Sequence, residues 1–292
     1  MLSEVIQALR IQSGKWYLDA TFGRGGHSQE ILKLGGSVLG FDHDGSAIEY
    51  AHREFAEQIR DGKLQLFREN MEKVREVLSS FEKPIVGVLI DAGVSSPQLD
   101  DSSRGFAFMH EAPLDMRMDK RLAVTAKDLV NALGKKELES LLQKFAQETK
   151  ARVIAEAIVR RRKERAIETT TDLADIIQRA VGKFGTPGKL HPATKTFMAL
   201  RIAVNDELGS LERAMPQFMD LLAIDGRIVT IGFHEGEDRI FKTQFNEWEK
   251  QGLGEHLTHS VLLPQSEEIL QNPRSRSAKL RIFEKQPQKE QA

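Results

Sequence analysis

Three glycines follow an acidic residue at the end of an apolar, β-rich run. Residues Trp16–Thr21 predict a buried strand, and the chain then passes through Gly23-Arg24-Gly25-Gly26 into a predicted helix, Ser28–Leu34. Glycines let a backbone approach a ligand closely, and a helix N-terminus offers free N–H groups to an anion. Because the spacing is G-x-G-G rather than G-x-G-x-x-G, a diphosphate cofactor is disfavoured. S-adenosylmethionine fits, since its methionyl end carries one small carboxylate and an ammonium.

Two further acids end predicted strands. Asp42 ends the strand Ser37–Asp42, where an acid can accept hydrogen bonds from ribose hydroxyls, and Asp91 ends the strand Ile85–Asp91. Ligands of an open parallel sheet bind beyond the carboxyl ends of its strands, so we expect Asp91 to face the same crevice as Gly25 and Asp42, with Gln98 on a covering loop. A carboxylate and an amide beside a methyl donor suit an amine acceptor, because they orient its N–H groups and relieve its developing charge.

Each feature also has a structural interpretation. The glycines could form an ordinary βα turn, and Asp91 could cap its own loop. His27 could cap a helix, act as a general base or bind a metal; no partner lies at ligand spacing, which favours a backbone or cofactor contact. Asp42-His43-Asp44 contains metal-binding residue types, but adjacent strand side chains point to opposite faces, so no metal is expected.

The elements that must position these residues follow an α/β pattern. Strands alternate with helices up to Asp91, which predicts right-handed crossovers and a parallel sheet covered on both faces. From about Phe106 to Leu208 there is no convincing strand, and the α/β rhythm then returns. We therefore expect a discontinuous first domain, 1–105 and 209–292, with an inserted helical domain, 106–208. The other predicted elements are helices Ser46–Ile59 (N-cap Ser46), Met71–Phe81, Ala126–Leu133, Lys135–Phe145, Lys150–Arg165, Thr171–Val181, Ala193–Leu208, Leu211–Leu222 and Glu237–Glu249; strands Lys63–Phe67 and Gly226–Phe233; an antiparallel pair His256–Leu263 and Ala278–Glu284; a loop Gly182–Pro192; and a frayed tail Lys285–Ala292.

Composition excludes several classes of protein. The chain has 292 residues, 40% of them hydrophobic, and a net charge of −1, which is typical of a soluble globular protein. It lacks an apolar run of roughly 18 residues, and Met1–Arg10 does not resemble a secretory signal, so we expect neither a membrane span nor export. Zero cysteines exclude disulfides, Cys-ligated metals and thiol catalysis, and fit a cytoplasmic setting.

Charge is distributed unevenly along the chain. Residues 106–208 contain 19 Lys and Arg against 14 Asp and Glu, a net charge of +5 in a chain of −1. Much of the basic excess lies in Arg160–Arg165. A basic helical domain suits a polyanionic substrate, although a solvated helix face would have the same composition.

An ordered set of motifs extends through nearly the whole chain and resembles the ribosomal RNA small subunit methyltransferase H (MraW-like) family. The motifs are DATFGRGGHS (Asp19–Ser28), GVSSPQLD (Gly93–Asp100), RGFAF (Arg104–Phe108), PLDMRMD (Pro113–Asp119), HPATKTFMALRIAVNDEL (His191–Leu208), FHEGEDRIFK (Phe233–Lys242) and NPRSRSAKLR (Asn272–Arg281). The resemblance implies a Rossmann-like class I methyltransferase fold, with a mostly parallel seven-stranded sheet and an inserted all-helical RNA-recognition domain. It implies S-adenosylmethionine-dependent methylation of N4 of a decoding-centre cytidine in 16S ribosomal RNA. The implied partner is small-subunit RNA, in an assembled 30S particle; monomer and homodimer both remain open.

The resemblance also carries residues over. It places cofactor contacts at Gly25, Gly26, His27, Asp42, Met71, Asp91 and Gln98, and substrate contacts to phosphates at Arg117, Arg274 and Arg276. Asp91 is the expected catalytic residue. Met71 stands where the family usually has Phe, so a thioether would replace an aromatic contact to adenine. The family's usual H-x-P-V stretch ahead of Met1 is absent.

Two other functions remain open. A noncatalytic ribosome-assembly factor could bind the cofactor as a ligand, although Asp91 and Gln98 argue against it. An amine methyltransferase acting on DNA would usually carry an aromatic residue after a Pro-Pro pair, and Ser95-Ser96-Pro97-Gln98 has none.

Overall fold

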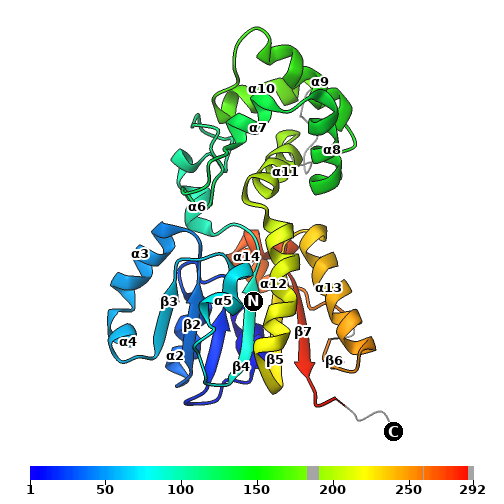
Figure 1. Ribbon diagram of the computed structural model, residues 1–292. Helices are drawn as coiled ribbons and strands as arrows, with labels where there is room; N and C mark the ends of the chain where they lie inside the picture. Colours follow the sequence, from blue (N-terminus) through cyan, green and yellow to red (C-terminus); the bar gives the residue numbers. More distant parts are fainter. Residues whose placement is uncertain (183–190, 259, 289–292) are drawn as a thin grey trace. The chain divides into compact units, whose positions relative to one another are not determined.

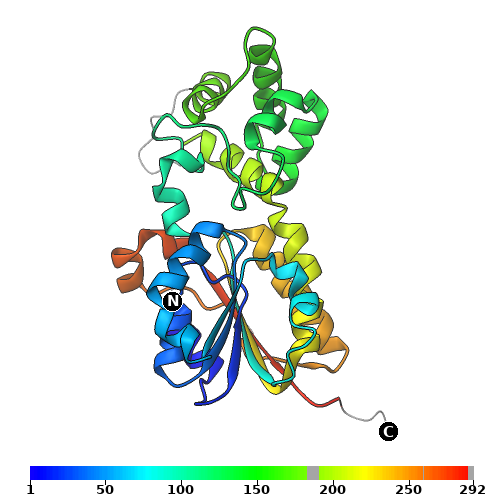
Figure 2. The ribbon, with the colours of Figure 1, turned by 60° about the vertical axis from the view of Figure 1, so that its left-hand side comes forward.

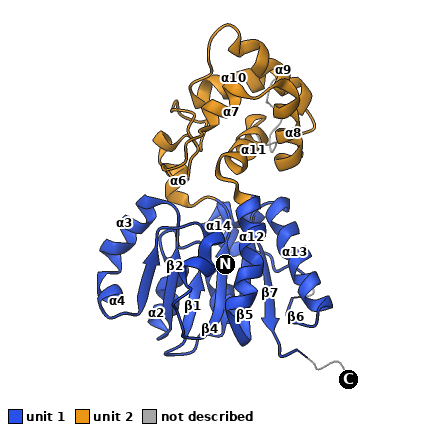
Figure 3. Cartoon of the chain, viewed as in Figure 1, with its two compact units in different colours: residues 1–93, 208–292 blue, residues 94–207 orange. Residues whose placement is uncertain are grey.

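The computed structural model describes residues 1–182, 191–258 and 260–288, and the chain forms two compact units. Unit 1 comprises residues 1–93 and 208–292, and unit 2 comprises residues 94–207 (Figure 3). The sequence places the first boundary after residue 105, whereas in the structure it follows Gly93. The difference arises because Val94 and Leu99 pack against the hydrophobic core of unit 2.

Unit 1 is built on a seven-stranded sheet in the order β3-β2-β1-β4-β5-β7-β6 (Figure 1). β7 runs antiparallel to both of its neighbours, and the pairs among β1 to β5 are parallel. The α/β fold predicted from the sequence is confirmed. The strands are β1 Trp16–Asp19, β2 Ser37–Phe41, β3 Leu64–Phe67, β4 Ile85–Asp91, β5 Leu222–Gly232, β6 Gly254–His256 and β7 Lys279–Lys285.

Helices cover both faces of this sheet (Figure 2). Side chains alternate along β1: Tyr17 enters the core cluster that contains residues of α1, α2 and α3, and Leu18 enters the cluster that contains residues of α5, α12 and α13. Burial on both faces explains why the strands read as continuous apolar runs. The helices and 3-10 turns are α1 Leu2–Leu9, α2 Gly26–Lys33, α3 Gly45–Glu54, α4 Ala56–Arg60, η1 Met71–Lys73, α5 Val74–Val77, α12 Glu207–Leu221, α13 Glu235–Lys250, α14 Ser266–Gln271 and η3 Pro273–Ser277.

Two predicted helices differ from those observed. The helix expected over Ser46–Ile59 is divided into α3 and α4 at the buried Phe55, whose φ of −112° leaves the helical range. Its N-cap is Asp44 rather than Ser46, because the Asp44 carboxylate accepts from the backbone N–H of Ser46 at 2.9 Å. The helix expected over Met71–Phe81 is a 3-10 turn followed by α5, which ends at Val77.

The antiparallel pairing expected at the C-terminus is present, but its first strand is β6, which shares only His256 with the predicted strand His256–Leu263. β6 pairs with β7 over Gly254–His256, and further along the chain a single bridge joins Leu262 to Leu280. The loop predicted over 182–192 and the end of the predicted tail lie largely outside the described residues.

Unit 2 is helical where it is described, and a single β-bridge joins Pro113 to Thr169. Its core is made of buried aliphatic side chains such as Leu142, Ile154 and Leu200. No helix in the described ranges is both long and apolar enough to cross a bilayer. The helices and the 3-10 turn of this unit are α6 Ser96–Asp100, η2 Ser102–Arg104, α7 Ala126–Ala132, α8 Lys135–Ala146, α9 Ala151–Arg162, α10 Thr170–Val181 and α11 Ala193–Asn205.

Candidate active site

The polar residues predicted to form a site in unit 1 gather at one edge of the sheet. Asp19 and Asp91 are the last residues of β1 and β4, and Asp42 directly follows β2. Met71 begins η1, which is the first element after β3. These strands are adjacent and parallel, so their carboxyl ends lie at the same edge of the sheet, which is where ligands of such sheets bind.

The two glycines that begin α2 have different roles. Gly25 is the N-cap residue with φ 70°, and a Cβ there would lie 2.6 Å from the Phe22 ring and 2.8 Å from the Phe55 ring. Gly25 is therefore required by the packing of this turn. Apart from its chain neighbours and the backbone of its own helix, no atom of the described residues lies within 4 Å of a Cβ placed on Gly26, so Gly26 borders open space in front of the helix. A backbone that is bare on this side can approach a ligand.

His27, the second residue of α2, lies beside Asp91. Its Nε2 is 3.4 Å from Oδ2 of Asp91, while Nδ1 of His27 and Oδ1 of Asp91 are buried without a hydrogen-bond partner in the described residues. Burial opposes protonation of His27, but the hydrogen bond and charge of Asp91 outweigh it, so the pKa of His27 lies above its ordinary value. The backbone N–H of Asp91 donates to Oγ1 of Thr21 at 2.7 Å, which anchors the end of β4 to the turn after β1.

Asp19 is a buried acid that the sequence alone did not assign to the site. Its carboxylate accepts from the Ser28 hydroxyl at 2.7 Å and from the Thr21 backbone N–H at 3.2 Å. Burial raises the pKa of Asp19 to about 6 despite these hydrogen bonds. The sequence feature that could have assigned Asp19 to the site is an acid at the end of a predicted strand, directly before a glycine turn.

Asp42 supports the glycine turn. Its two oxygens accept from the backbone N–H groups of Gly23 and Asp44, each at 2.8 Å, and burial raises the pKa of its carboxyl. Each carboxylate oxygen has two lone pairs, so it can also accept from a ribose hydroxyl. Met71 is partly buried against the core on the α5 side, so its thioether replaces an aromatic ring at a packed position.

Gln98 belongs to unit 2, where it forms a capping box. Its side-chain oxygen accepts from the backbone N–H of Ser95 at 2.9 Å, and the side chain is buried. The amide therefore fixes the first turn of α6.

The three arginines predicted to contact substrate differ in their surroundings. Arg117 donates to both oxygens of Asp115 at 2.8 and 2.9 Å and to the carbonyl of Leu122 at 2.6 Å, so its guanidinium holds its own loop together. Arg274 and Arg276 are exposed on η3 of unit 1. The strand that follows, β7, starts opposite Gly232 at the end of β5, which places η3 at the edge of the sheet where the parallel strands end.

Asn205 and Arg104 hold the loop of unit 2 that contains Arg117. The sequence motifs did not assign either residue to a site. Asn205 Nδ2 donates to the carbonyl of Met116 at 2.8 Å and its Oδ1 accepts from the N–H of Met118 at 2.7 Å. Arg104 donates to the carbonyls of Arg117 and Met118. Met116 is fully buried with φ 62°, an unfavourable backbone conformation for a residue with a side chain. An asparagine at a buried position of a predicted helix was the signal for this contact.

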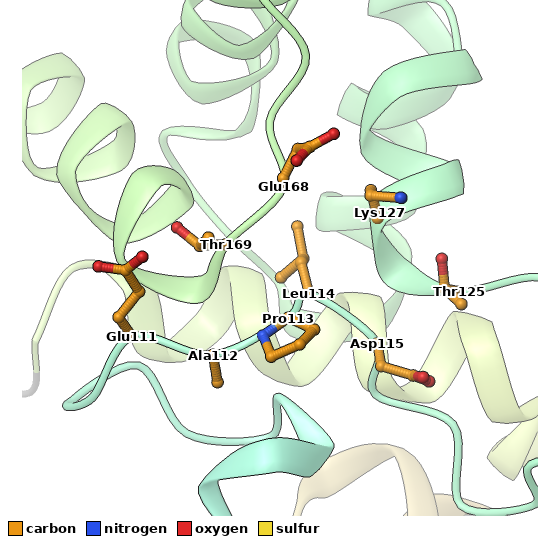
Figure 4. Close-up of a pocket in the computed structure, with 9 residues that line it drawn as sticks. All are labelled: Glu111, Ala112, Pro113, Leu114, Asp115, Thr125, Lys127, Glu168 and Thr169. Atoms are coloured by element: carbon orange, nitrogen blue, oxygen red, sulfur yellow. The ribbon is translucent and has the colours of Figure 1, made fainter.

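The same loop forms one wall of an open pocket of about 470 Å³ in unit 2 (Figure 4). Pro113, Leu114 and Asp115 run beside Glu168 and Thr169, to which the first two are joined by backbone pairing, and Lys127 and Thr125 contribute from the start of α7. The carboxylate of Asp115 already accepts hydrogen bonds from Arg117, and the Thr125 hydroxyl donates to the carboxylate of Asp128.

The strand order of unit 1, its single reversed strand and the polar groups at the ends of β1 to β4 define a Rossmann-like methyltransferase. The chain belongs to the MraW methylase family, whose model matches residues 1–286. It is 42% identical over 307 residues to the ribosomal RNA small subunit methyltransferase H of Geotalea uraniireducens, covering 98% of this chain and 97% of that protein. It is 39% identical over 303 residues to the protein of that name from Limosilactobacillus fermentum, covering 98% and 96%. It is also similar to a solved structure, a putative methyltransferase from Streptococcus mutans in complex with SAH, with a TM-score of 0.46, 13% identity and 97% coverage of both chains.

Proposed function

We propose that this methyltransferase transfers a methyl group from S-adenosylmethionine to N4 of a decoding-centre cytidine in the RNA of the small ribosomal subunit. Its relatives named ribosomal RNA small subunit methyltransferase H, similar over almost their whole length, support the RNA class. The observation that carries the chemistry is Asp91, whose Oδ1 is buried at the carboxyl edge of the sheet with no partner among the described residues. A carboxylate oxygen in that position is suited to accept an N–H of an amine. We assign the reaction to the cytoplasm and the acceptor RNA to an assembled 30S particle.

The residues of unit 1 fit the cofactor. The open space before Gly26 lets a ligand approach the backbone N–H groups at the start of α2, including that of His27, where the helix dipole favours a carboxylate. Asp42 would accept from the ribose, and Met71 would contact the adenine. Gln98 is the remaining cofactor contact that the family resemblance implies. When bound, S-adenosylmethionine supplies the methyl group and the sulfonium leaving group.

The residues of this chain then orient the acceptor. The exocyclic amine of cytosine is conjugated and weakly basic, so its reaction depends on alignment more than on a strong base. Asp91 would accept one amine N–H through Oδ1, keep the nitrogen in line with the methyl carbon, and take the proton that the nitrogen loses as its bond to carbon forms. Arg274 and Arg276 would hold phosphates near this edge, with Arg117 shaping the loop of unit 2 that borders the substrate. A base inside a stack must be flipped out to reach Asp91.

The test is transfer of a labelled methyl group to 30S particles, naked small-subunit RNA and duplex DNA, followed by mass spectrometry of the nucleosides. We expect N4-methylcytidine from RNA and no methylated DNA. Asp91→Asn keeps the shape of the side chain but removes its charge, and should lower turnover at saturating cofactor by about 100-fold, the scale of one preorganised polar group. RNA affinity, measured by calorimetry, should change little, and cofactor affinity is measured alongside because the family resemblance also makes Asp91 a cofactor contact. Equal turnover in both proteins would refute a role for Asp91 in the reaction, and methylation of another atom would refute the N4 assignment.

A further inference from the structure

The side chain of His27 is in contact with the proposed catalytic residue. The first turn of α2 carries it to the end of β4, because α2 follows β1 and β1 pairs directly with β4. Its Nε2 lies 3.4 Å from Oδ2 of Asp91, and the two side chains are 17% and 31% exposed. A carboxylate oxygen only accepts hydrogen bonds, so we assign a proton to Nε2 and make Nε2–H the donor of this pair.

The two oxygens of Asp91 are therefore not equivalent. Oδ2 faces His27, and Oδ1 is buried and has no partner among the described residues. A carboxylate held through one oxygen has a fixed rotation about its Cβ–Cγ bond. The other oxygen then points in one direction, as a group that aligns an acceptor requires.

We propose that His27 is a positioning residue for Asp91, whose Nε2–H holds Oδ2 so that Oδ1 is directed at the amine that receives the methyl group. This rests on the proposed function, in which Asp91 accepts an N–H of that amine. His27 acts through Asp91 and takes no part in breaking or forming the methyl bonds. The backbone of His27 remains a contact for the cofactor, and its side chain has this separate task.

Three charged groups surround His27 and determine how it titrates. They are Asp91 on β4, Asp19 on β1 and the amino group of Met1, which is itself ion-paired with Glu268. The two acids favour the protonated ring and the amino group opposes it. With the proton of the neutral ring also assigned to Nε2, the contact with Asp91 persists as His27 titrates, so the titration reports on the contact.

The first test needs no cofactor and no substrate. The pKa of His27, followed by NMR of its ring signals in the free protein, should fall in Asp91→Asn because the negative partner is lost. Unfolding curves of both proteins show that they are folded. A pKa of His27 that is the same in Asp91→Asn and the native protein would overturn the contact, and with it the proposal.

The second test separates positioning from binding. His27→Phe keeps a ring but removes the donor, and His27→Gln restores an N–H near the position of Nε2. Single-turnover methyl transfer at saturating cofactor should fall by about 10-fold to 100-fold in His27→Phe, the scale of a misplaced reacting group, and should largely recover in His27→Gln. Cofactor affinity should change much less than the rate.

The third test asks whether the two residues act as one. On an Asp91→Asn background, His27→Phe should cause little further loss, because the carboxylate that it positions is already gone. The same fold loss on both backgrounds would overturn the proposal, as would a rate loss that saturating cofactor abolishes. If the native protein transfers no methyl group to any RNA, the proposed function fails and the positioning role fails with it, whereas the NMR titration still shows whether the two side chains are paired.

Discussion

The carboxylate of Asp19 accepts a hydrogen bond from the Ser28 hydroxyl at 2.7 Å, and both residues are almost completely buried. This contact joins the end of β1 to the first turn of α2 across the glycine turn. It keeps a buried acid next to His27 and Asp91, both of which influence its titration.

The buried acid predicts a specific dependence of stability on pH. The pKa of Asp19 is about 6 in the folded protein and 3.8 in the unfolded chain, so the folded state holds this proton between those pH values while the unfolded state releases it. Its contribution to the free energy of unfolding therefore falls as pH rises through this window and is constant above it. Asp19→Asn cannot titrate at this position. The free energy of unfolding of Asp19→Asn relative to that of the native protein, measured with urea, should therefore be about 2 kcal/mol higher at pH 8 than at pH 4.5. A difference that is the same at both pH values would contradict the burial of a charged Asp19.

Gly26 and Gly25 should respond differently to alanine. Gly26→Ala adds a methyl group in open space, so the free energy of unfolding should stay equal or rise by up to about 1 kcal/mol, while cofactor affinity falls about 10-fold because the methyl group enters the ligand's space. Gly25→Ala should instead destabilise the protein by about 1–3 kcal/mol through contact with Phe22 and Phe55. Calorimetry and urea unfolding separate the two effects. Native affinity in folded Gly26→Ala would mean that the cofactor does not approach this turn.

Helix α9 provides a test of RNA binding by unit 2. Arg162 donates to the carbonyl of Val130 and Arg161 pairs with Glu164, whereas Arg152, Arg160 and Lys163 are exposed. Reversal of these three exposed residues to Glu should weaken RNA binding and make the salt dependence of log K shallower by up to about 3. Cofactor affinity should be unchanged.

A matched control uses unit 1. Reversal of the exposed Arg53, Lys242 and Lys250 to Glu makes the same change in net charge. If this control weakens RNA binding as much as the α9 variant does, the effect reflects overall charge, and α9 is not a specific RNA contact.

The loop that Asn205 holds should matter for the reaction beyond its effect on stability. Asn205→Ala leaves the buried carbonyl of Met116 and N–H of Met118 without their partner, at a cost of about 2–4 kcal/mol in unfolding free energy. Asn131 also makes three hydrogen bonds to main-chain atoms of unit 2, so Asn131→Ala is a comparable structural change away from this loop. Assayed well below their melting temperatures, Asn205→Ala should methylate RNA more slowly than Asn131→Ala. Equal rates would assign Asn205 a purely structural role.

The sequence alone determined the elements that depend on local pattern. Apolar runs in the sequence predicted β1, β2, β3 and β4. Asp42 and Asp91, the acids at the ends of two of these strands, were predicted to be site residues. Parallel strands align their carboxyl ends, so a common edge followed from the order of elements. The helices of unit 2 were equally visible, because their apolar periodicity is local.

Only the tertiary structure decided which side chains meet. The contact between His27 and Asp91 depends on β1 lying beside β4, and sequence separation gives no measure of that distance. The pairing of Arg117 with both oxygens of Asp115 likewise depends on the conformation of the loop that contains them. The first segment of unit 1 ends at Gly93 rather than at residue 105, the end expected from the sequence, because Val94 and Leu99 pack with residues far along the chain. Local pattern follows from the periodicity of the backbone, whereas the partner of a polar or apolar side chain depends on which distant segments the fold brings within a few ångströms.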